Sequence, residues 1–192
     1  MEFGPRALGN RSIIADARSP TMQKNLNLKV KFRESFRPFA PSIIAEDLPE
    51  WFEINCDSPY MMLVSNVKNK KCLQMTDEEK NLFGIDKLNI KRSMIPAVTH
   101  VDYSARIQTV HRETNLKYHK LIMDFKRKTG CPILVNTSFN VRGEPIVNTP
   151  EDAFNCFMGT AIDILVIGNC YLVKENQNKT LKKDYKNKYN LD

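Results

Sequence analysis

The sequence predicts an α/β (α+β) fold, and three observations support this class. Strand-like and helix-like segments alternate through the second half of the chain, as they do in α/β and α+β proteins. The 192 residues suffice for one hydrophobic core, or for one core and part of another. The composition is globular, with 42% hydrophobic and 27% charged residues. No apolar run approaches the ~20 residues that span a bilayer, and the first residues lack the apolar stretch of a secretory signal, so we expect a cytoplasmic protein without a membrane partner.

The first predicted elements lie between residues 11 and 44. Residues 11–16 have the pattern of a short strand or turn. Pro20 stands just inside a helix start, which predicts a helix to about Lys31. Two prolines keep residues 36–44 extended, because proline and the residue before it avoid the helix interior.

The middle of the chain is expected to contain a short helix among strands. Residues 60–64 form a strand candidate. Acidic residues after Thr76 favour a helix start there, and Gly84 is expected to end that helix. Residues 94–98 and 105–110 have the composition of two further strands, flanking a polar loop.

The last elements have the clearest signals. Apolar residues recur on one face of 116–128, and Gly130 is a typical helix stop. Residues 132–136 predict a buried strand. Thr149 and Pro150 begin a helix that ends near Gly159. Residues 164–167 are expected to form a buried strand, and residues 170–173 a strand adjacent to it.

Positive charge is concentrated at two places in the chain. Lysine and arginine number 29 against 22 acidic residues, a formal net charge of +7. Residues 1–42 are rich in arginine, which favours bidentate contacts with phosphate or carboxylate, so they are the better candidate for an anion site. Residues 174–192 are rich in lysine and asparagine. We expect a flexible, solvated tail there, with a docked or anion-binding tail as the alternative.

The five cysteines indicate reduced thiols rather than disulfides or a metal site. Their number is odd and no C-x-x-C spacing occurs. None of the three histidines pairs with a cysteine at ligand spacing. We therefore expect no metal ion held by this chain.

Two segments could bind phosphate. On a strand, alternation would place Lys31 and Arg33 on one side and Phe32 on the other, which presents two cations to a ligand. A solvated strand with its phenylalanines facing the core would have the same pattern. The second segment follows the strand at 132–136, and it supplies the small or basic side chains of Thr137, Ser138, Asn140 and Arg142. Polar groups at the carboxyl end of a strand bind ligands in open α/β sheets, although a turn that caps its own backbone has the same composition.

Two further groups could carry chemistry. Thr99, His100 and Asp102 invite comparison with a catalytic triad, but no G-x-S-x-G nucleophile motif is present and a polar loop explains them equally well. Arg106 follows in an apolar strand, where a partly buried guanidinium needs a carboxylate or an anionic ligand. Near the start, Arg6, Asn10 and Arg11 lie in a glycine-containing segment that could bind an anion but lacks a Walker A sequence.

Six segments of the chain match one known family in the family's own order. They are residues 1–12 (MEFGPRALGNRS), 31–42 (KFRESFRPFAPS), 96–102 (PAVTHVD), 105–110 (ARIQTV), 136–140 (NTSFN) and 143–147 (GEPIV). Over about residues 1–173 the chain thereby resembles the O-carbamoyltransferases of the NodU, CmcH and TobZ type.

The resemblance implies a particular domain organisation. Such enzymes have an N-terminal metallo-ATPase-like transferase domain and a C-terminal YrdC-like domain with a twisted, mixed, barrel-like sheet flanked by helices. By this resemblance, residues 1–16 are the end of the transferase domain, which is otherwise missing here, 17–173 are the YrdC-like domain, and 174–192 are the tail. The partners it implies are that transferase domain and a small-molecule acceptor, with a homodimer left open.

The same resemblance implies a reaction and its residues. The YrdC-like domain forms carbamoyl adenylate from carbamoyl phosphate and ATP with Mg²⁺, and the transferase domain moves the carbamoyl group to an acceptor hydroxyl. Lys31 and Arg33 match the family's K-x-R pair, and Ser138 and Asn140 match its S-x-N pair. By this resemblance Lys31, Arg33 and Arg106 are expected to be catalytic, with Arg106 on carbamoyl phosphate or carbamate, and Ser138 and Asn140 to bind the nucleotide or phosphate. We assign Thr99, His100, Thr137 and Arg142 to nucleotide or phosphate binding, and Arg6, Asn10 and Arg11 to an interdomain or anion-binding role.

Two other functions remain as alternatives. A threonylcarbamoyl-adenylate synthase for tRNA modification shares the YrdC-like fold, although the first twelve residues argue against it. A non-catalytic RNA- or nucleotide-binding module would use the basic residues of 1–42. Its phenylalanines lie among prolines rather than in a regular stacking platform, so a nucleic acid is not expected as a partner.

Overall fold

The computed structural model describes residues 6–189, so the first five residues of the segment that opens the chain lie outside the described residues. The chain forms two compact units. The first unit contains residues 6–23 and 36–138, and the second contains residues 24–35 and 139–189. The chain crosses between the units inside helix α1 (Met22–Lys29), between residues 35 and 36, and directly after Ser138.

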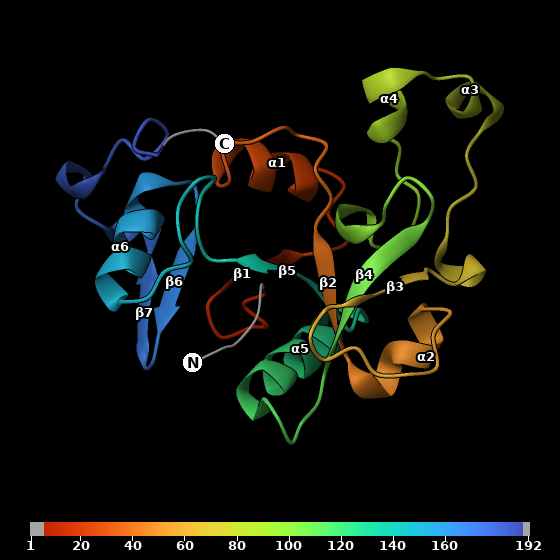
Figure 1. The fold of residues 1–192 in the computed structure, drawn as a ribbon, viewed down its shortest axis with the longest axis horizontal. Coiled ribbons are helices and arrows are strands. Elements are labelled where there is room, and N and C mark those ends of the chain that lie inside the picture. The colour runs from red at the N-terminus through yellow and green to blue at the C-terminus, as the bar shows by residue number, and fades with distance from the viewer. Residues whose placement is uncertain (1–5, 190–192) are drawn as a thin grey trace. The chain divides into compact units, whose positions relative to one another are not determined.

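The first unit is built on a five-stranded mixed sheet (Figure 1). Its strands, in spatial order, are β1 (Ser12–Asp16), β5 (Ile133–Ser138), β2 (Ala40–Ile44), β4 (Ser104–Val110) and β3 (Leu63–Asn66). Strands β2 and β4 pair in parallel, and the other neighbours pair antiparallel. The mixed sheet is as predicted. Barrel-like closure is not supported, because the edge strands β1 and β3 of the described residues do not pair with each other.

Helix α5 (Leu116–Thr129) packs on one face of this sheet (Figure 1). The helix begins at Asn115, whose side chain accepts a hydrogen bond from the backbone of Tyr118, and it ends at Gly130, whose φ is 75°. Its apolar face and the sheet form one buried cluster, which contains Ile44, Val110, Tyr118, Ile122 and Leu134. The other helices of this unit are short: α2 (Leu48–Trp51), α3 (Asp77–Lys80) and α4 (Gly84–Leu88).

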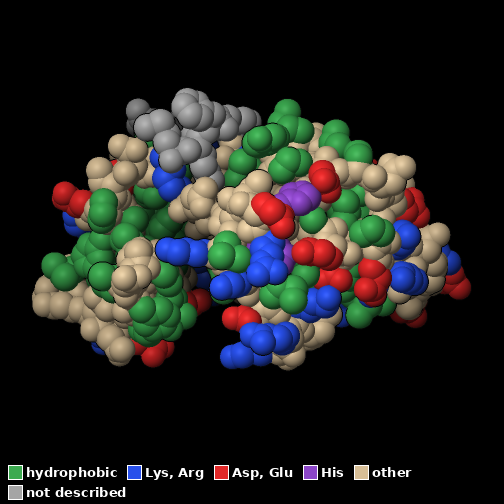
Figure 2. Space-filling view, turned by 90° about the horizontal axis from the view of Figure 1, so that it is seen from below, with side chains coloured by type: hydrophobic (Ala, Val, Ile, Leu, Met, Phe, Trp, Pro, Cys, Tyr) green, Lys and Arg blue, Asp and Glu red, His purple; other side chains and the backbone are tan. Residues whose placement is uncertain are grey.

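The second unit contains helix α6 (Pro150–Gly159) and the antiparallel hairpin of β6 (Ile164–Ile167) and β7 (Cys170–Val173). Thr149 and Asp152 form a reciprocal capping box at the start of α6. At its other end, the Lys174 ammonium donates to the carbonyl oxygens of Phe157 and Thr160. Apolar side chains gather on the face of this unit that Figure 2 shows, and those exposed on the hairpin are Ile164, Val166 and Tyr171.

Five predictions from the sequence were wrong in detail. The strand expected over residues 60–64 lies instead at Leu63–Asn66. Residues 94–98 are not a strand, because Pro96 opens a 3₁₀ helix over Pro96–Val98. Residue Gly84 begins α4 rather than ending α3, and its φ of 60° lets the chain turn between the two helices. No strand forms over residues 31–36, since Phe32 adopts a φ of 50°. In β6 only Leu165 is fully buried, because the hairpin packs on one side alone.

Within residues 6–189, no helix is long and apolar enough to cross a membrane. All five cysteines are free thiols, and Cys131 and Cys156 are buried.

Candidate functional site

The face of the sheet that carries α5 changes from apolar to polar along β4. Alternation along the strand places Ser104, Arg106, Gln108 and Val110 on this one face. Val110 belongs to the apolar cluster under α5. Gln108 begins the polar part, because its Oε1 accepts hydrogen bonds from Ser42 Oγ at 2.5 Å and from Asn136 Nδ2 at 2.6 Å. Three neighbouring strands are thus joined by buried side-chain hydrogen bonds.

The segment that opens the described chain is fixed to this polar part. Gln108 Nε2 donates to the carbonyl oxygen of Leu8 at 3.1 Å. The next residue, Gly9, has a φ of 100°, and a Cβ there would overlap the ring of Tyr118. Asn10 Oδ1 accepts a hydrogen bond from Asn115 Nδ2 at 3.1 Å, at the start of α5. Arg6 and Arg11 therefore stand on either side of an anchored turn.

Arg106 and Arg6 together carry positive charge that lacks a carboxylate partner. Within residues 6–189, the side chain of Arg106 forms no ion pair or hydrogen bond, and the Nε of Arg6 is buried without a hydrogen-bond partner. Burial lowers the pKa of Arg106, and the nearby charge of Arg6 lowers it further. Two guanidinium groups that repel each other in a half-buried place are suited to bind an anion.

His100 lies near Arg106 and is held as part of a turn. Its Nδ1 is 3.1 Å from Ser104 Oγ, which donates to Asp102 Oδ1 at 2.7 Å. Burial lowers the pKa of His100, the charge of Asp102 opposes this change, and Arg106 adds to it. The ring can therefore accept or donate a hydrogen bond beside an anion without adding charge.

The hydroxyl of Thr99 is used inside its own loop. It donates to the carbonyl oxygen of Ile95 at 2.9 Å and lies 2.7 Å from Ser93 Oγ. Thr99 is hydrogen-bonded to Ser93 and Ile95, and His100 is hydrogen-bonded to Ser104. The described contacts therefore do not pair Thr99 as a nucleophile with His100 as its base.

The end of β5 presents Thr137 and Ser138 in half-buried positions. They pair with Ile13 and Ser12 of the edge strand β1. Alternation places Ser138 on the same face as Asn136, the face that carries α5. The chain passes from Ser138 directly into the second unit, where Asn140 lies.

In the second unit, Lys31 is bound to Asn140. The Lys31 side chain is only 4% exposed, and its Nζ donates to the backbone oxygen and to Oδ1 of Asn140 at 2.9 and 2.8 Å. The pKa of Lys31 is lowered to about 7, mainly by burial and also by the charge of Arg33, whereas Cys156 and Glu144 act to raise it. This lysine can therefore change charge near neutral pH.

Asn140 is oriented from its other side by Glu144. The amide Nδ2 of Asn140 donates to the backbone oxygen of Glu144 at 2.6 Å, and Glu144 Oε2 accepts from the backbone N–H of Val141 at 2.9 Å. Gly143, with a φ of 74°, turns the chain between them. The loop after Phe139 is thus closed on itself and carries Asn140 at a fixed place.

Arg33 and Arg142 flank this pair. Arg33 Nε donates to Asn27 Oδ1 at 2.6 Å, while Arg142 Nη1 lies 3.5 Å from Glu34 Oε1. The backbone N–H of Arg142 donates to the carbonyl oxygen of Lys31 at 3.1 Å. The structure therefore brings Lys31, Arg33, Asn140 and Arg142 together in the second unit, and Arg6, His100 and Arg106 in the first.

Four residues of these networks were not predicted from the sequence. Ser42 and Gln108 lay in the segments quoted for the family resemblance, and Gln108 shares its strand face with Arg106, so alternation could have indicated it. Glu144 and Tyr185 meet across 41 residues, with a distance of 2.7 Å between Tyr185 Oη and Glu144 Oε1. No local pattern in the sequence signals that contact. Among the described residues no group of three or more His, Cys, Asp or Glu could hold a metal ion.

Comparisons with known proteins identify the family of this chain. The family model for the carbamoyltransferase C-terminus matches residues 1–174. An uncharacterized protein of Synechocystis is 60% identical over 177 residues, which cover 92% of this chain and 29% of that protein. Nodulation protein NolNO of Sinorhizobium fredii is 46% identical, with 91% and 23% covered, and nodulation protein U of the same species is 36% identical, with 88% and 26% covered. The chain spans less than a third of the length of each of these relatives. It belongs to the carbamoyltransferase C-terminal family.

Proposed function

We propose that this chain activates a carbamoyl group as carbamoyl adenylate, using carbamoyl phosphate and ATP, for transfer to a hydroxyl of a small-molecule acceptor. The observation that carries the proposal is the pair Arg106 and Arg6, which have no carboxylate partner within residues 6–189. A half-buried cation pair of this kind is stabilised when a phosphate or carbamate binds to it.

The chemistry needs fixed cations and small donors rather than a nucleophilic side chain. Carbamoyl phosphate and water give carbamate and phosphate. A carboxylate oxygen of carbamate then attacks the α-phosphorus of ATP, a phosphorus–oxygen bond forms, and pyrophosphate leaves with the electron pair of the broken bond. The reaction requires that the two anions are held within reach of each other and that the charge on the phosphoryl group is stabilised.

We assign the parts of this task by side-chain chemistry. Arg106, with Arg6 and the ring of His100, takes the carbamoyl phosphate or carbamate. In the second unit, Lys31, Asn140, Arg33 and Arg142 are assigned to the phosphates and the adenylate. In the first unit, Thr137 and Ser138 are assigned to nucleotide binding. Thr99 fixes the loop of His100 by its hydrogen bond to Ile95, and Asn10 holds the segment that carries Arg6 and Arg11. Mg²⁺ would arrive on ATP, since oxygen atoms of the phosphates supply most of its ligands.

The acceptor and the transfer step belong to the rest of a longer protein in this proposal. The chain spans 23–29% of the length of the three relatives named above, so most of each relative lies outside the matched region. We propose that a preceding transferase domain takes the adenylate and binds the acceptor.

An RNA-binding module is the weaker proposal. Basic side chains on the face shown in Figure 2 are interspersed with acidic ones and do not form a continuous stripe. Binding along a phosphate backbone depends on such a stripe and falls steeply with salt. RNA binding that weakens strongly with salt, without nucleotide turnover, would favour this alternative.

The test is ligand binding and pyrophosphate release by the folded chain. Calorimetry should detect ATP, a non-hydrolysable ATP analogue and carbamoyl phosphate, and pyrophosphate should appear only when ATP and carbamoyl phosphate are both present. Ser138→Ala should weaken nucleotide binding without lowering the melting temperature, whereas Ser65→Ala in edge strand β3 serves as the matched control. No binding by folded protein at millimolar ligand would contradict the proposal. Pyrophosphate release that instead requires threonine and bicarbonate would identify a threonylcarbamoyl-adenylate synthase.

A further inference from the structure

The segment of residues 179–189 packs on the second unit through Tyr185. This side chain is only 2% exposed, and its ring lies against Gly159 at the end of α6, where a Cβ would overlap it. Lys183 Nζ also donates to Asn155 Oδ1 of α6 at 2.6 Å. The sequence left open a flexible tail and a docked tail, and the buried Tyr185 side chain is docked. The family match ends at residue 174, so the contact is made by residues beyond it.

Two tyrosine hydroxyls meet on one carboxylate oxygen. Tyr185 and Tyr189 donate to Glu144 Oε1 at 2.7 and 3.0 Å, and their rings pack edge to face with centroids 5.6 Å apart. Burial raises the pKa of Tyr185, so its hydroxyl stays protonated and acts as a donor. The Val141 N–H donates to Oε2, the Cys156 thiol also forms a hydrogen bond with the Glu144 side chain, and Glu144 is 8% exposed. These donors keep the buried charge stable.

Glu144 connects these tyrosines to Lys31. Its backbone oxygen holds the Asn140 amide, and both oxygen acceptors of Asn140 hold Lys31 Nζ. We propose that Tyr185 and Tyr189 are positioning residues, which hold Lys31 and Asn140 in place for nucleotide phosphates through Glu144. The role in nucleotide binding rests on the proposed function, whereas the contacts themselves do not.

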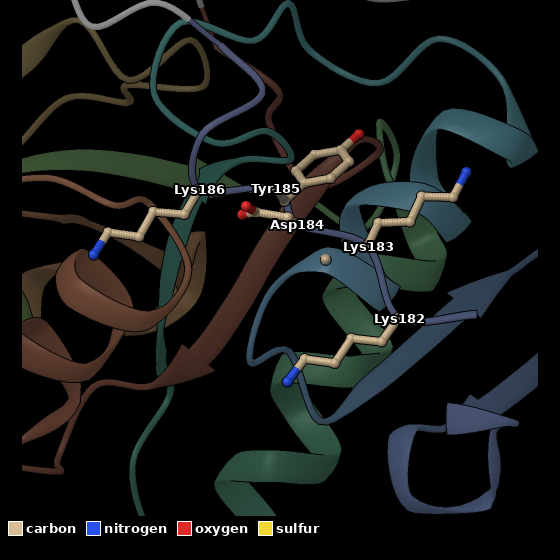
Figure 3. A pocket seen from close by; sticks show the side chains of 6 residues that line it. Lys182, Lys183, Asp184, Tyr185 and Lys186 are labelled. Atoms are coloured by element: carbon tan, nitrogen blue, oxygen red, sulfur yellow. The ribbon is translucent and has the colours of Figure 1, made fainter. Parts of the chain in front are cut away.

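The lysines of the same segment do not form a second anion site. A pocket of about 390 Å³ is lined by Gly159 and residues 182–186. Figure 3 shows that Lys183 extends in the opposite direction to Lys182 and Lys186, and that the three amines do not meet at a common centre. In this segment it is therefore the tyrosine side chains, and not the lysines, that contact the buried Glu144.

The contacts make a specific prediction about the charge of Lys31. The charged or titratable groups that act on it are Arg33 on its own segment, Glu144 on the loop after Phe139, and Cys156 on α6, which Lys174 also influences. Without the two hydroxyls, Glu144 Oε1 loses both tyrosine donors, and the loop that holds the Asn140 amide is less firmly placed. Lys31 Nζ then loses part of its hydrogen bonding to Asn140, which favours the charged ammonium, so the pKa of Lys31, which is lowered to about 7 with burial as the main cause, should fall further.

The experiment compares the double variant Tyr185→Phe/Tyr189→Phe with wild type and with Tyr171→Phe, which changes an exposed tyrosine of β7 in the same unit. The Lys31 ammonium is titrated by NMR of its labelled side chain, with Lys31→Met to assign the signal. Its titration midpoint should move to lower pH in the double variant and stay unchanged in Tyr171→Phe. Binding of ATP at pH 7 should weaken about tenfold in the double variant, the size expected from losing one charge-assisted hydrogen bond, and should recover at pH 6.

A second variant tests the same contact by changing the surface on which the Tyr185 ring packs. Gly159→Ala keeps the side chains of both tyrosines and of Glu144 in the sequence, but its Cβ displaces the Tyr185 ring from α6. It should move the Lys31 midpoint in the same direction as the double variant. Unchanged Lys31 titration in a folded double variant, or a loss of melting temperature with no change in the midpoint, would overturn the proposal. Absence of ATP binding by wild type would contradict the proposed function alone, because the Lys31 titration would still report the positioning contacts.

Discussion

Asn136 and Gln108 share a hydrogen bond of 2.6 Å between Nδ2 and Oε1 in the buried centre of the sheet. The same Asn136 amide also donates to Ser42 Oγ at 3.0 Å. Asn136 opens the segment NTSFN, whose later members are candidate ligand contacts. Its own amide is instead used to join β5 to β2 and β4, so the segment combines a structural residue with residues assigned to binding.

We predict that Asn136→Ala lowers the free energy of unfolding by about 2 kcal/mol, because Ser42 and Gln108 lose a buried donor. The measurement is denaturant unfolding at equilibrium. The matched control is Asn66→Ala on the exposed edge strand β3, which should change the unfolding free energy by less than about 0.5 kcal/mol. Equal effects of the two substitutions would show that the buried network contributes nothing specific.

Replacing Arg106 by a neutral residue should remove its electrostatic repulsion with Arg6. In phosphate-free buffer, Arg106→Met should unfold at the same temperature as wild type or higher, because the guanidinium has no carboxylate partner within residues 6–189 and repels Arg6. Arg18→Met is the control. It breaks a 2.6 Å ion pair with Asp16 and should cost about 0.5 kcal/mol at this exposed position.

Phosphate should then separate a ligand-binding role of Arg106 from a structural one. Phosphate at ten times its dissociation constant stabilises a protein by about 1.4 kcal/mol, which raises the melting temperature of a chain of this size by about 3 °C. We expect this rise in wild type and Arg18→Met, and a smaller one in Arg106→Lys, which keeps the charge but loses the bidentate fork. Thermal melts at matched ionic strength measure it. An equal rise in melting temperature in all three proteins would contradict the assignment of Arg106 as an anion-binding residue.

Lys31 should make stability depend on pH in a direction that follows from its burial. Its pKa falls from 10.5 to about 7 on folding, so between these values the unfolded chain binds more protons than the folded chain. Stability therefore rises with pH across this window, by up to about 1.4 kcal/mol per pH unit for one group.

The contribution of Lys31 can be isolated by a difference between variants. The unfolding free energy of wild type minus that of Lys31→Met should increase from pH 7 to pH 10, while the same difference for Lys24→Met, an exposed lysine of α1, should stay flat. Denaturant titrations at several pH values provide both series. A flat difference for Lys31 would mean that the ammonium keeps its ordinary pKa in the folded protein.

Local signals predicted the elements whose ends are fixed by side chains or by backbone shape. Gly130 ends α5 with a φ of 75°, and Thr149 with Pro150 begins α6, as the sequence indicated. The strand expected at 94–98 failed because a short apolar run has no periodicity that separates a strand from a 3₁₀ turn. The alternation expected for Lys31 and Arg33 failed because Phe32 takes a positive φ, which sequence patterns do not signal.

The candidate site was predictable where family motifs named single residues, and not where distant segments complete it. Lys31 and Asn140, quoted as members of two separate motifs, are in direct contact. Their link to Tyr185 depends on packing between the loop after Phe139 and a segment about 40 residues later. Long-range packing of this kind is decided by burial and shape, so neither composition nor spacing could have shown it.

Gly9 should be the least replaceable residue of the anchored turn beside Arg6. Two separate penalties act there: a φ of 100°, which side chains rarely adopt, and overlap of any Cβ with the buried ring of Tyr118. Gly84 supplies the comparison, because its φ is 60° and a Cβ added there would meet no atom within 4 Å. Gly84→Ala should cost about 1 kcal/mol for backbone strain alone, whereas Gly9→Ala should cost about 3 kcal/mol because the ring or the turn must also move. Denaturant unfolding measures both.

Because the displaced turn carries Arg6, Gly9→Ala should also reduce the phosphate-dependent rise in melting temperature, and Gly84→Ala should leave that rise intact. If Gly9→Ala lowered stability but kept the full phosphate effect, the anchored turn would hold the fold together without placing Arg6 at the anion.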